Sequence, residues 1–188
     1  MKSHVRQVKE ELPLVLVFIA VIWGVFILDR ILPLEQWGLV PRDIGGLAGI
    51  FTMPFLHSDW GHIVSNTMPL LILLTLLAGS KANSRLIVAG IMLLSGGLLW
   101  LFGRGSSLHI GASGLVFGLA VFLIVSGILE KRLVPLLVAV LVVFLYGSSL
   151  LTGIMPFQQG VSWDGHLFGG LAGGLMAWTL VRREKASG

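Results

Sequence analysis

The chain has 188 residues, of which 55% are hydrophobic and 12% are charged, and its mean hydropathy is +0.94. A soluble domain carries about a quarter charged residues, so this composition excludes an ordinary soluble globular protein and indicates an integral membrane protein. The absence of cysteine excludes disulfides, thiol catalysis and thiolate metal sites. The net charge of +4 could suggest a nucleic-acid partner, but the basic residues are distributed as membrane topology requires, so we predict none.

Six apolar runs are long enough to cross a bilayer, and they predict an all-α membrane bundle that forms a single domain over residues 1–188. The first run ends at Asp29-Arg30 without a small-residue cleavage pattern, so we expect a retained span rather than a signal peptide. The expected spans are 12–32, 60–79, 85–103, 112–129, 133–151 and 164–181.

A long connection over residues 33–59 separates the first two spans. It holds Pro33, Pro41 and Pro54 among scattered hydrophobic residues, so it is too apolar for a solvated linker and too interrupted for a span. We therefore expect a loop that is partly embedded in the membrane.

The basic residues predict the orientation in the membrane. With the N-terminus inside, ten of the 13 lysines and arginines lie in inner segments, and only Arg30, Arg42 and Arg104 lie in outer ones. The positive-inside rule therefore predicts that both termini are cytoplasmic. The loop 33–59 and the starts of the fourth and sixth spans then lie toward the outer side.

A serine and a histidine stand at the starts of those two spans. Ser113 lies within Gly111-Ala112-Ser113-Gly114, and His166 follows Gly165. Polar groups at membrane depth are costly and are functional candidates, and a hydroxyl with an imidazole is the simplest nucleophile–base pair. Each could instead only hydrogen-bond between helices. A serine at a helix start also lies beside free backbone N–H groups that suit an oxyanion.

Glycines at four-residue spacing follow both residues. The sixth span carries Gly169 and Gly173, interleaved with a second such pair, and the fourth span carries Gly114 and Gly118. Small residues at this spacing let helix backbones approach closely. We therefore expect the fourth and sixth spans to pack together near His166.

The segment 57–66 contributes a third group, His57, His62 and Asn66. His62 and Asn66 are four residues apart, so they share a helix face, and both can donate hydrogen bonds to an anionic oxygen. His57, His62 and His166 could nominally bind a metal. The His62 face carries no carboxylate and the His-Glu-x-x-His pattern is missing, so we predict no metal and no cofactor.

Asp164 and His109 lie near these candidates without a predicted catalytic role. Asp164 precedes His166 by two residues, a spacing that points it away from the imidazole on a helix. We therefore interpret it as a helix cap or an outer-surface charge rather than the third member of a triad. His109, in an outer loop, is assigned no role.

Together these residues resemble the rhomboid family of intramembrane serine proteases. The resemblance rests on three motifs in order, each on the expected span: His57-x4-His62-x3-Asn66, Gly111-x-Ser113-Gly114 and Gly165-His166-x-x-Gly169-x-x-x-Gly173. It implies a six-transmembrane-helix bundle with a water-accessible cavity that opens to the outer face. It further implies that Ser113 is the nucleophile and His166 the general base.

The resemblance also implies the remaining roles. His62 and Asn66 would line the oxyanion hole with the backbone N–H of Ser113, and the partners would be the lipid bilayer and transmembrane protein substrates, cleaved near the outer leaflet through an acyl-enzyme. Two positions depart from the family's pattern. Ala48-Gly49 stands where some bacterial members carry a Trp-Arg pair, so the loop anchoring differs, and Phe117 replaces a common tyrosine one turn after the serine.

Two other interpretations compete with a protease. A non-catalytic rhomboid-like protein that binds or clears unstable transmembrane helices would lack the serine or the histidine, and both are present. A small transporter would place acidic residues at mid-membrane, whereas Asp29 and Asp164 lie near span ends. The compact chain without a targeting extension favours a prokaryotic plasma membrane.

Overall fold

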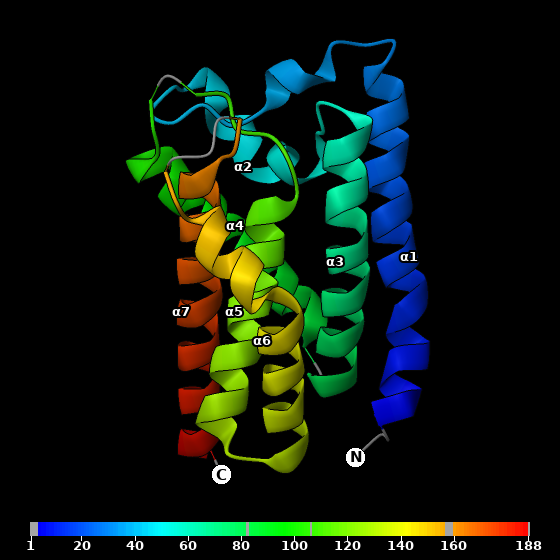
Figure 1. Cartoon of the computed structure of the whole chain (residues 1–188), viewed down its shortest axis with the longest axis vertical. Coiled ribbons are helices and arrows are strands. Elements are labelled where there is room, and N and C mark those ends of the chain that lie inside the picture. Colours follow the sequence, from blue (N-terminus) through cyan, green and yellow to red (C-terminus); the bar gives the residue numbers. More distant parts are fainter. Residues whose placement is uncertain (1–3, 82, 106, 157–159, 188) are drawn as a thin grey trace.

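The computed structural model describes residues 4–81, 83–105, 107–156 and 160–187, and it is built from long helices (Figure 1). These are α1 (His4–Asp29), α3 (Trp60–Ser80), α4 (Ser84–Phe102), α5 (Ser113–Glu130), α6 (Leu133–Gly153) and α7 (Trp163–Ser187). Four short helical turns lie between α1 and α3: η1 (Leu34–Trp37), η2 (Gly45–Ala48), α2 (Gly49–Thr52) and η3 (Met53–Phe55). The described residues form no β-strand, only an isolated antiparallel bridge between Leu39 and His109. The all-α prediction is confirmed.

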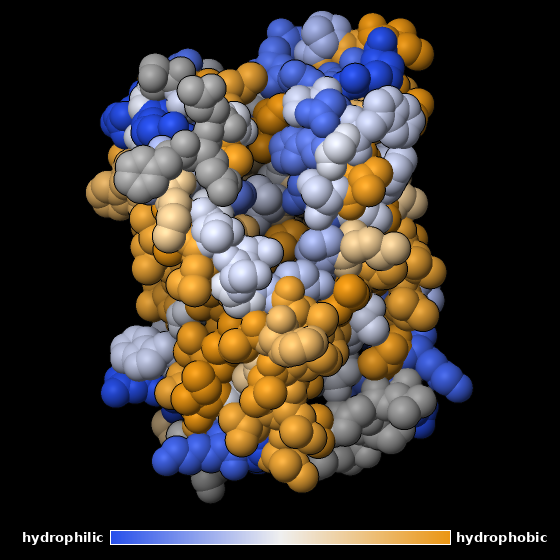
Figure 2. Space-filling model, in the orientation of Figure 1, coloured by the Kyte–Doolittle hydropathy of each residue, from blue (hydrophilic) through white to orange (hydrophobic). Residues whose placement is uncertain are grey.

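By length and composition, five helices of the described chain can cross a membrane: α1, α3, α4, α5 and α6. The helix predicted as the sixth span, α7, also forms, but its glycines, its polar first turn and the charges near its end, among them Arg182 and Arg183, make it less apolar than the others. Its most extensive packing is against α5, and it also packs on α4. The apolar sides of these helices form a hydrophobic belt between two hydrophilic ends of the molecule (Figure 2). Such a belt is typical of an integral membrane protein.

The bundle is centred on α5, the most deeply buried of the five apolar helices, whereas α6 is the least buried. Leu115, Leu119 and Phe122 of α5 are fully buried in the main core. Both termini lie at one end of the bundle, and the short helices after α1 lie at the other, which we call the first-loop end (Figure 1). Both α5 and α7 begin toward the first-loop end, where Ser113 is the first residue of α5 and His166 lies in the first turn of α7.

The first helix ends at Asp29, three residues before the predicted end of the span at 32. The Asp29 carboxylate accepts hydrogen bonds from the backbone N–H groups of Leu34 at 2.6 Å and Glu35 at 3.0 Å. These bonds fold the chain back on itself and start the loop.

The loop 33–59 is held against the end of α4 rather than left free. Arg42 donates from Nη1 to the Gly103 carbonyl at 2.7 Å, and Trp100 donates from Nε1 to the Asp43 carbonyl at 2.9 Å. A Cβ on Gly49 would overlap the backbone of Leu39, so this position needs glycine. The chain therefore anchors the loop without the Trp-Arg pair, through residues of the loop and of α4.

Candidate active site

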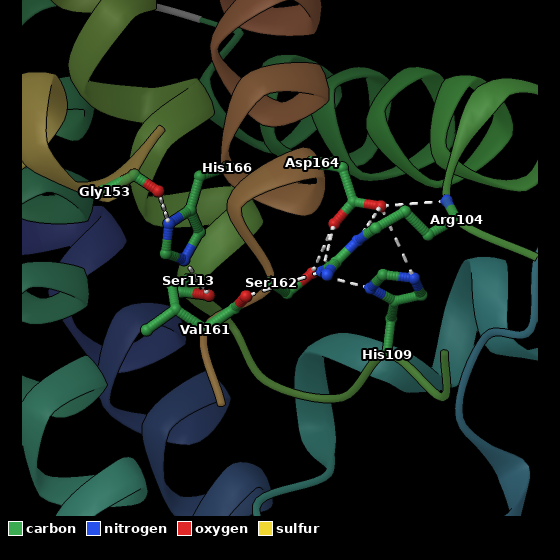
Figure 3. Close-up of polar contacts among 8 residues, drawn as sticks. All are labelled: Arg104, His109, Ser113, Gly153, Val161, Ser162, Asp164 and His166. Carbon is green, nitrogen blue, oxygen red and sulfur yellow. Dashed lines mark hydrogen bonds and ion pairs between the residues drawn. The ribbon is translucent and has the colours of Figure 1, made fainter. Parts of the chain in front are cut away.

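The structure brings Ser113 and His166 into hydrogen-bond contact. Ser113 Oγ at the start of α5 lies 2.8 Å from Nε2 of His166 in the first turn of α7 (Figure 3). This is the distance at which a hydroxyl can transfer its proton to an imidazole.

A backbone carbonyl holds the His166 imidazole in the tautomer that leaves Nε2 free to accept the Ser113 proton. His166 Nδ1 lies 2.8 Å from the carbonyl oxygen of Gly153, the last residue of α6. A carbonyl can only accept, so Nδ1 carries the proton, and in the neutral ring Nε2 is the free acceptor for the Ser113 hydroxyl. The ring of Phe117 stacks on the imidazole at 4.1 Å between centroids and 10° between planes. The orientation of the His166 imidazole thus depends on the end of α6 and one phenyl ring.

Glycines let the two helices come close enough for this contact. A Cβ on Gly169 would overlap the carbonyl of Gly114, and a Cβ on Gly173 would overlap the carbonyl of Gly118. Only glycine therefore fits at these crossing points between α5 and α7. The prediction that the fourth and sixth spans pack through their glycines is confirmed.

The predicted oxyanion residues lie on α3. Asp59 caps this helix by accepting from the backbone N–H of His62 at 2.9 Å. Asn66 is 5% exposed and donates from Nδ2 to the His62 carbonyl at 2.8 Å, which leaves its second amide hydrogen for another acceptor. The His62 ring covers Gly111, where a Cβ would overlap Nε2 and where φ is +112°. Glycine at 111 therefore lets α3 approach residues 109–113, the segment that leads into Ser113 and is called the serine segment below.

Ser113, His166, His62 and Asn66 line one cavity of about 780 Å³. Its wall also includes hydroxyl and charged groups, among them Ser58 and Asp59, and Figure 2 shows pale and blue residues around a hollow toward the first-loop end. The Ser58 hydroxyl donates to Asp59 at 2.7 Å and, with the His62 backbone N–H, lowers the pKa of that carboxyl. Such a wall can hold water within an otherwise apolar bundle.

His57 lies behind His62 and outside the cavity lining. Its ring is fully buried and meets the His62 ring edge-on at 4.9 Å between centroids, and neither nitrogen has a hydrogen-bond partner among the described residues. Burial, aided by the neighbouring His62, lowers its pKa from 6.5 to about 4, so the ring is neutral at pH 7. The structure places it as a support for His62 rather than beside Ser113. No group of three histidine, aspartate or glutamate side chains within the described residues is arranged to hold a metal.

The interpretation of Asp164 as a cap or outer-surface charge is wrong. Its carboxylate is buried and receives three hydrogen bonds from Arg104, and Nε2 of buried His109 lies 3.8 Å from it (Figure 3). Asp164 makes no contact with the His166 ring, whose Nδ1 partner is Gly153. The sequence signal for this network was the pair of opposite charges at neighbouring span ends on the same predicted side.

Comparison with known proteins identifies the family of the chain. A sequence model described as the Rhomboid domain matches residues 45–183. Uncharacterized proteins of Mycobacterium bovis and Mycobacterium tuberculosis are 37% identical over 182 residues, which cover 91% of this chain and 75% of theirs. A protein of Mycobacterium leprae, also described as uncharacterized, is 36% identical over 182 residues, covering 91% of this chain and 72% of its own. By the extent of both matches, the chain belongs to the rhomboid family.

Proposed function

We propose that this chain is an intramembrane serine endopeptidase that cleaves transmembrane segments of membrane proteins. The observation that carries the proposal is the 2.8 Å contact of Ser113 Oγ with His166 Nε2 on the wall of a polar cavity in an apolar bundle. Family membership supports the same activity, because rhomboid proteins are generally intramembrane serine proteases.

The reaction is acyl transfer in two stages. Ser113 Oγ attacks the peptide carbonyl carbon while His166 Nε2 takes the hydroxyl proton. The C–N bond then breaks, and the same proton passes from Nε2 to the leaving amine. Water from the cavity hydrolyses the resulting ester, with His166 as the base. The Gly153 carbonyl stabilises the imidazolium that forms at each stage, in place of a carboxylate.

The oxyanion would be stabilised by three kinds of donor. The helix bonds of α5 begin at the Val116 N–H, so the backbone N–H groups at 113–115 have no partner within the helix. Asn66 offers its second amide hydrogen. His62 offers Nε2–H in the tautomer that carries its proton on Nε2, in which Nδ1 accepts from the Ser58 hydroxyl 3.3 Å away once that hydroxyl turns from Asp59. Each such donor is worth about 3 kcal/mol of barrier.

The setting of the reaction is also part of the proposal. Residues 1–188 form one membrane domain with both termini in the cytoplasm of a prokaryotic cell. The cavity then opens toward the outer side of the plasma membrane. The 10-to-3 distribution of basic residues and the termini at one end of the bundle support this orientation.

The test is cleavage of a tagged model transmembrane substrate by the purified protein in vesicles. Ser113→Ala and His166→Ala are expected to abolish cleavage and reaction with a fluorophosphonate. Ser126→Ala is the matched control, because Ser126 is a buried serine on the same helix whose hydroxyl donates to the Leu123 carbonyl at 3.3 Å. Retained cleavage by Ser113→Ala would refute the proposal. A helix-binding protein without activity would bind the substrate and leave both the substrate and the fluorophosphonate unreacted.

A further inference from the structure

Two chain segments lie side by side at the first-loop end and are joined twice. Ser113 and His166 are 53 residues apart in sequence, and so are His109 and Ser162, which precede them by four positions each. His109 Nδ1 lies 2.6 Å from Ser162 Oγ (Figure 3). The segments 109–113 and 162–166 are therefore connected by a second hydrogen bond next to the catalytic one.

An ion pair between a buried carboxylate, Asp164, and the partly exposed Arg104 reinforces this second connection. The Asp164 side chain is 3% exposed and accepts from Arg104 at three donors: the backbone N–H at 3.0 Å, Nη2 at 3.1 Å and Nε at 3.3 Å. The Arg104 guanidinium also lies 5.4 Å from the Trp163 ring centre. A buried carboxylate with this many charge-assisted bonds has little freedom, so α7 is fixed to the α4–α5 loop at its first turn.

Both catalytic residues are attached to these contacts. The Ser162 carbonyl accepts the backbone N–H of His166 at 3.0 Å. On the other segment, the backbone of His109 pairs with Leu39, and the N–H of Gly111 donates to the Met53 carbonyl at 2.9 Å. The serine segment is therefore held by the first loop on one side and by α7 on the other. Burial lowers the pKa of His109, so its ring is neutral and stays in this arrangement at pH 7.

We propose that Arg104, His109, Ser162 and Asp164 form a loop–helix clamp that sets the distance between Ser113 Oγ and His166 Nε2. Ser162 and Asp164 are then positioning residues, which act on the reaction through His166; Ser162 lies on the cavity wall and Asp164 behind it. The inference rests on the proposed function, because the distance matters only if this pair reacts.

The test is the kinetics of fluorophosphonate labelling of the full-length protein. Ser162→Ala and Asp164→Asn are expected to lower the labelling rate constant about tenfold, since a displacement of about 1 Å in a reacting pair can cost 10²-fold. The inhibitor concentration for half-maximal rate and the final labelled fraction should stay unchanged. Ser162→Thr keeps the hydroxyl and should retain the rate. Asp43→Asn removes an exposed carboxylate of the first loop and serves as the control.

Two results would overturn the clamp. One is unchanged rate constants in Ser162→Ala and Asp164→Asn. The other is a normal rate constant with a smaller labelled fraction, which would indicate loss of folded protein and a merely structural role. If the wild type itself does not label, the proposed function fails, and hydrogen exchange then tests the clamp separately. Faster exchange of the amides of residues 109–112 in Ser162→Ala supports it, and unchanged exchange refutes it.

Discussion

The crossing of α5 and α7 offers a quantitative test of the site, because Gly169 and Gly170 are adjacent and differ in their surroundings. A Cβ on Gly169 would lie 2.8 Å from the Gly114 carbonyl carbon, and closer still to its oxygen, whereas ordinary contact begins at 3.4 Å. The Gly169→Ala variant must therefore separate the helices by at least about 0.6 Å, the difference between these two distances. A Cβ on Gly170 would meet only Val121 Cγ2, at 3.4 Å.

A separation of this size acts directly on the reacting pair. It would lengthen the 2.8 Å contact between Ser113 and His166 beyond the usual range of an O–H···N hydrogen bond. We expect Gly169→Ala to slow fluorophosphonate labelling about tenfold and to lower the free energy of unfolding by about 1–3 kcal/mol through overpacking. Labelling kinetics and thermal unfolding of the purified protein in detergent measure the two effects. Equal labelling rates in Gly169→Ala and Gly170→Ala would refute the argument that the glycine contact sets the geometry of the dyad.

Four further predictions follow from single contacts. The free energy of unfolding of the wild type should fall by up to about 3 kcal/mol as the pH falls from 6.5 to about 4, because the unfolded chain binds a proton at His57 before the folded protein does. His57→Phe should abolish this part of the pH dependence. An equal loss of stability in the variant and the wild type over this pH range would contradict the prediction. Asn66→Ala should lower turnover of a model substrate about 10²–10³-fold, and a loss below about threefold would remove Asn66 from the oxyanion hole. Phe117→Leu should slow labelling about threefold to tenfold by removing the stacked ring, whereas Phe117→Tyr should not; equal rates in both variants would argue against the stack. Arg42→Gln should lower stability by about 1 kcal/mol and speed proteolysis of the first loop, and wild-type proteolysis rates would show that this anchor is dispensable.

Much of the fold could be predicted because the apolar runs are bounded by charges and glycines. The start of α5 at Ser113 lies one residue from the predicted start of its span, and α7 begins one residue before the predicted 164. The glycine spacing identified the α5–α7 contact, because backbone approach at such a crossing depends only on residue size.

The partners of buried polar groups could not be predicted in the same way. The bonds of Asp164 come from Arg104, 60 positions away in sequence, and Nδ1 of His166 is held by the backbone oxygen of Gly153, which no side-chain pattern marks. The early end of α1 has a similar cause, since it depends on which N–H groups reach the Asp29 carboxylate after the turn. Such contacts depend on tertiary geometry rather than on local sequence.

The carbonyl that orients the base belongs to α6, the least buried of the apolar helices. A displacement of the end of α6 would move the Gly153 carbonyl away from Nδ1 and leave the Phe117 stack to hold the imidazole alone. Under the proposed function, the Ser113–His166 pair would lack an oriented base while the end of α6 is displaced and would regain it when α6 returns. If the chain cleaves peptides as proposed, the position of the last turn of α6 would thus decide when the base is ready to react.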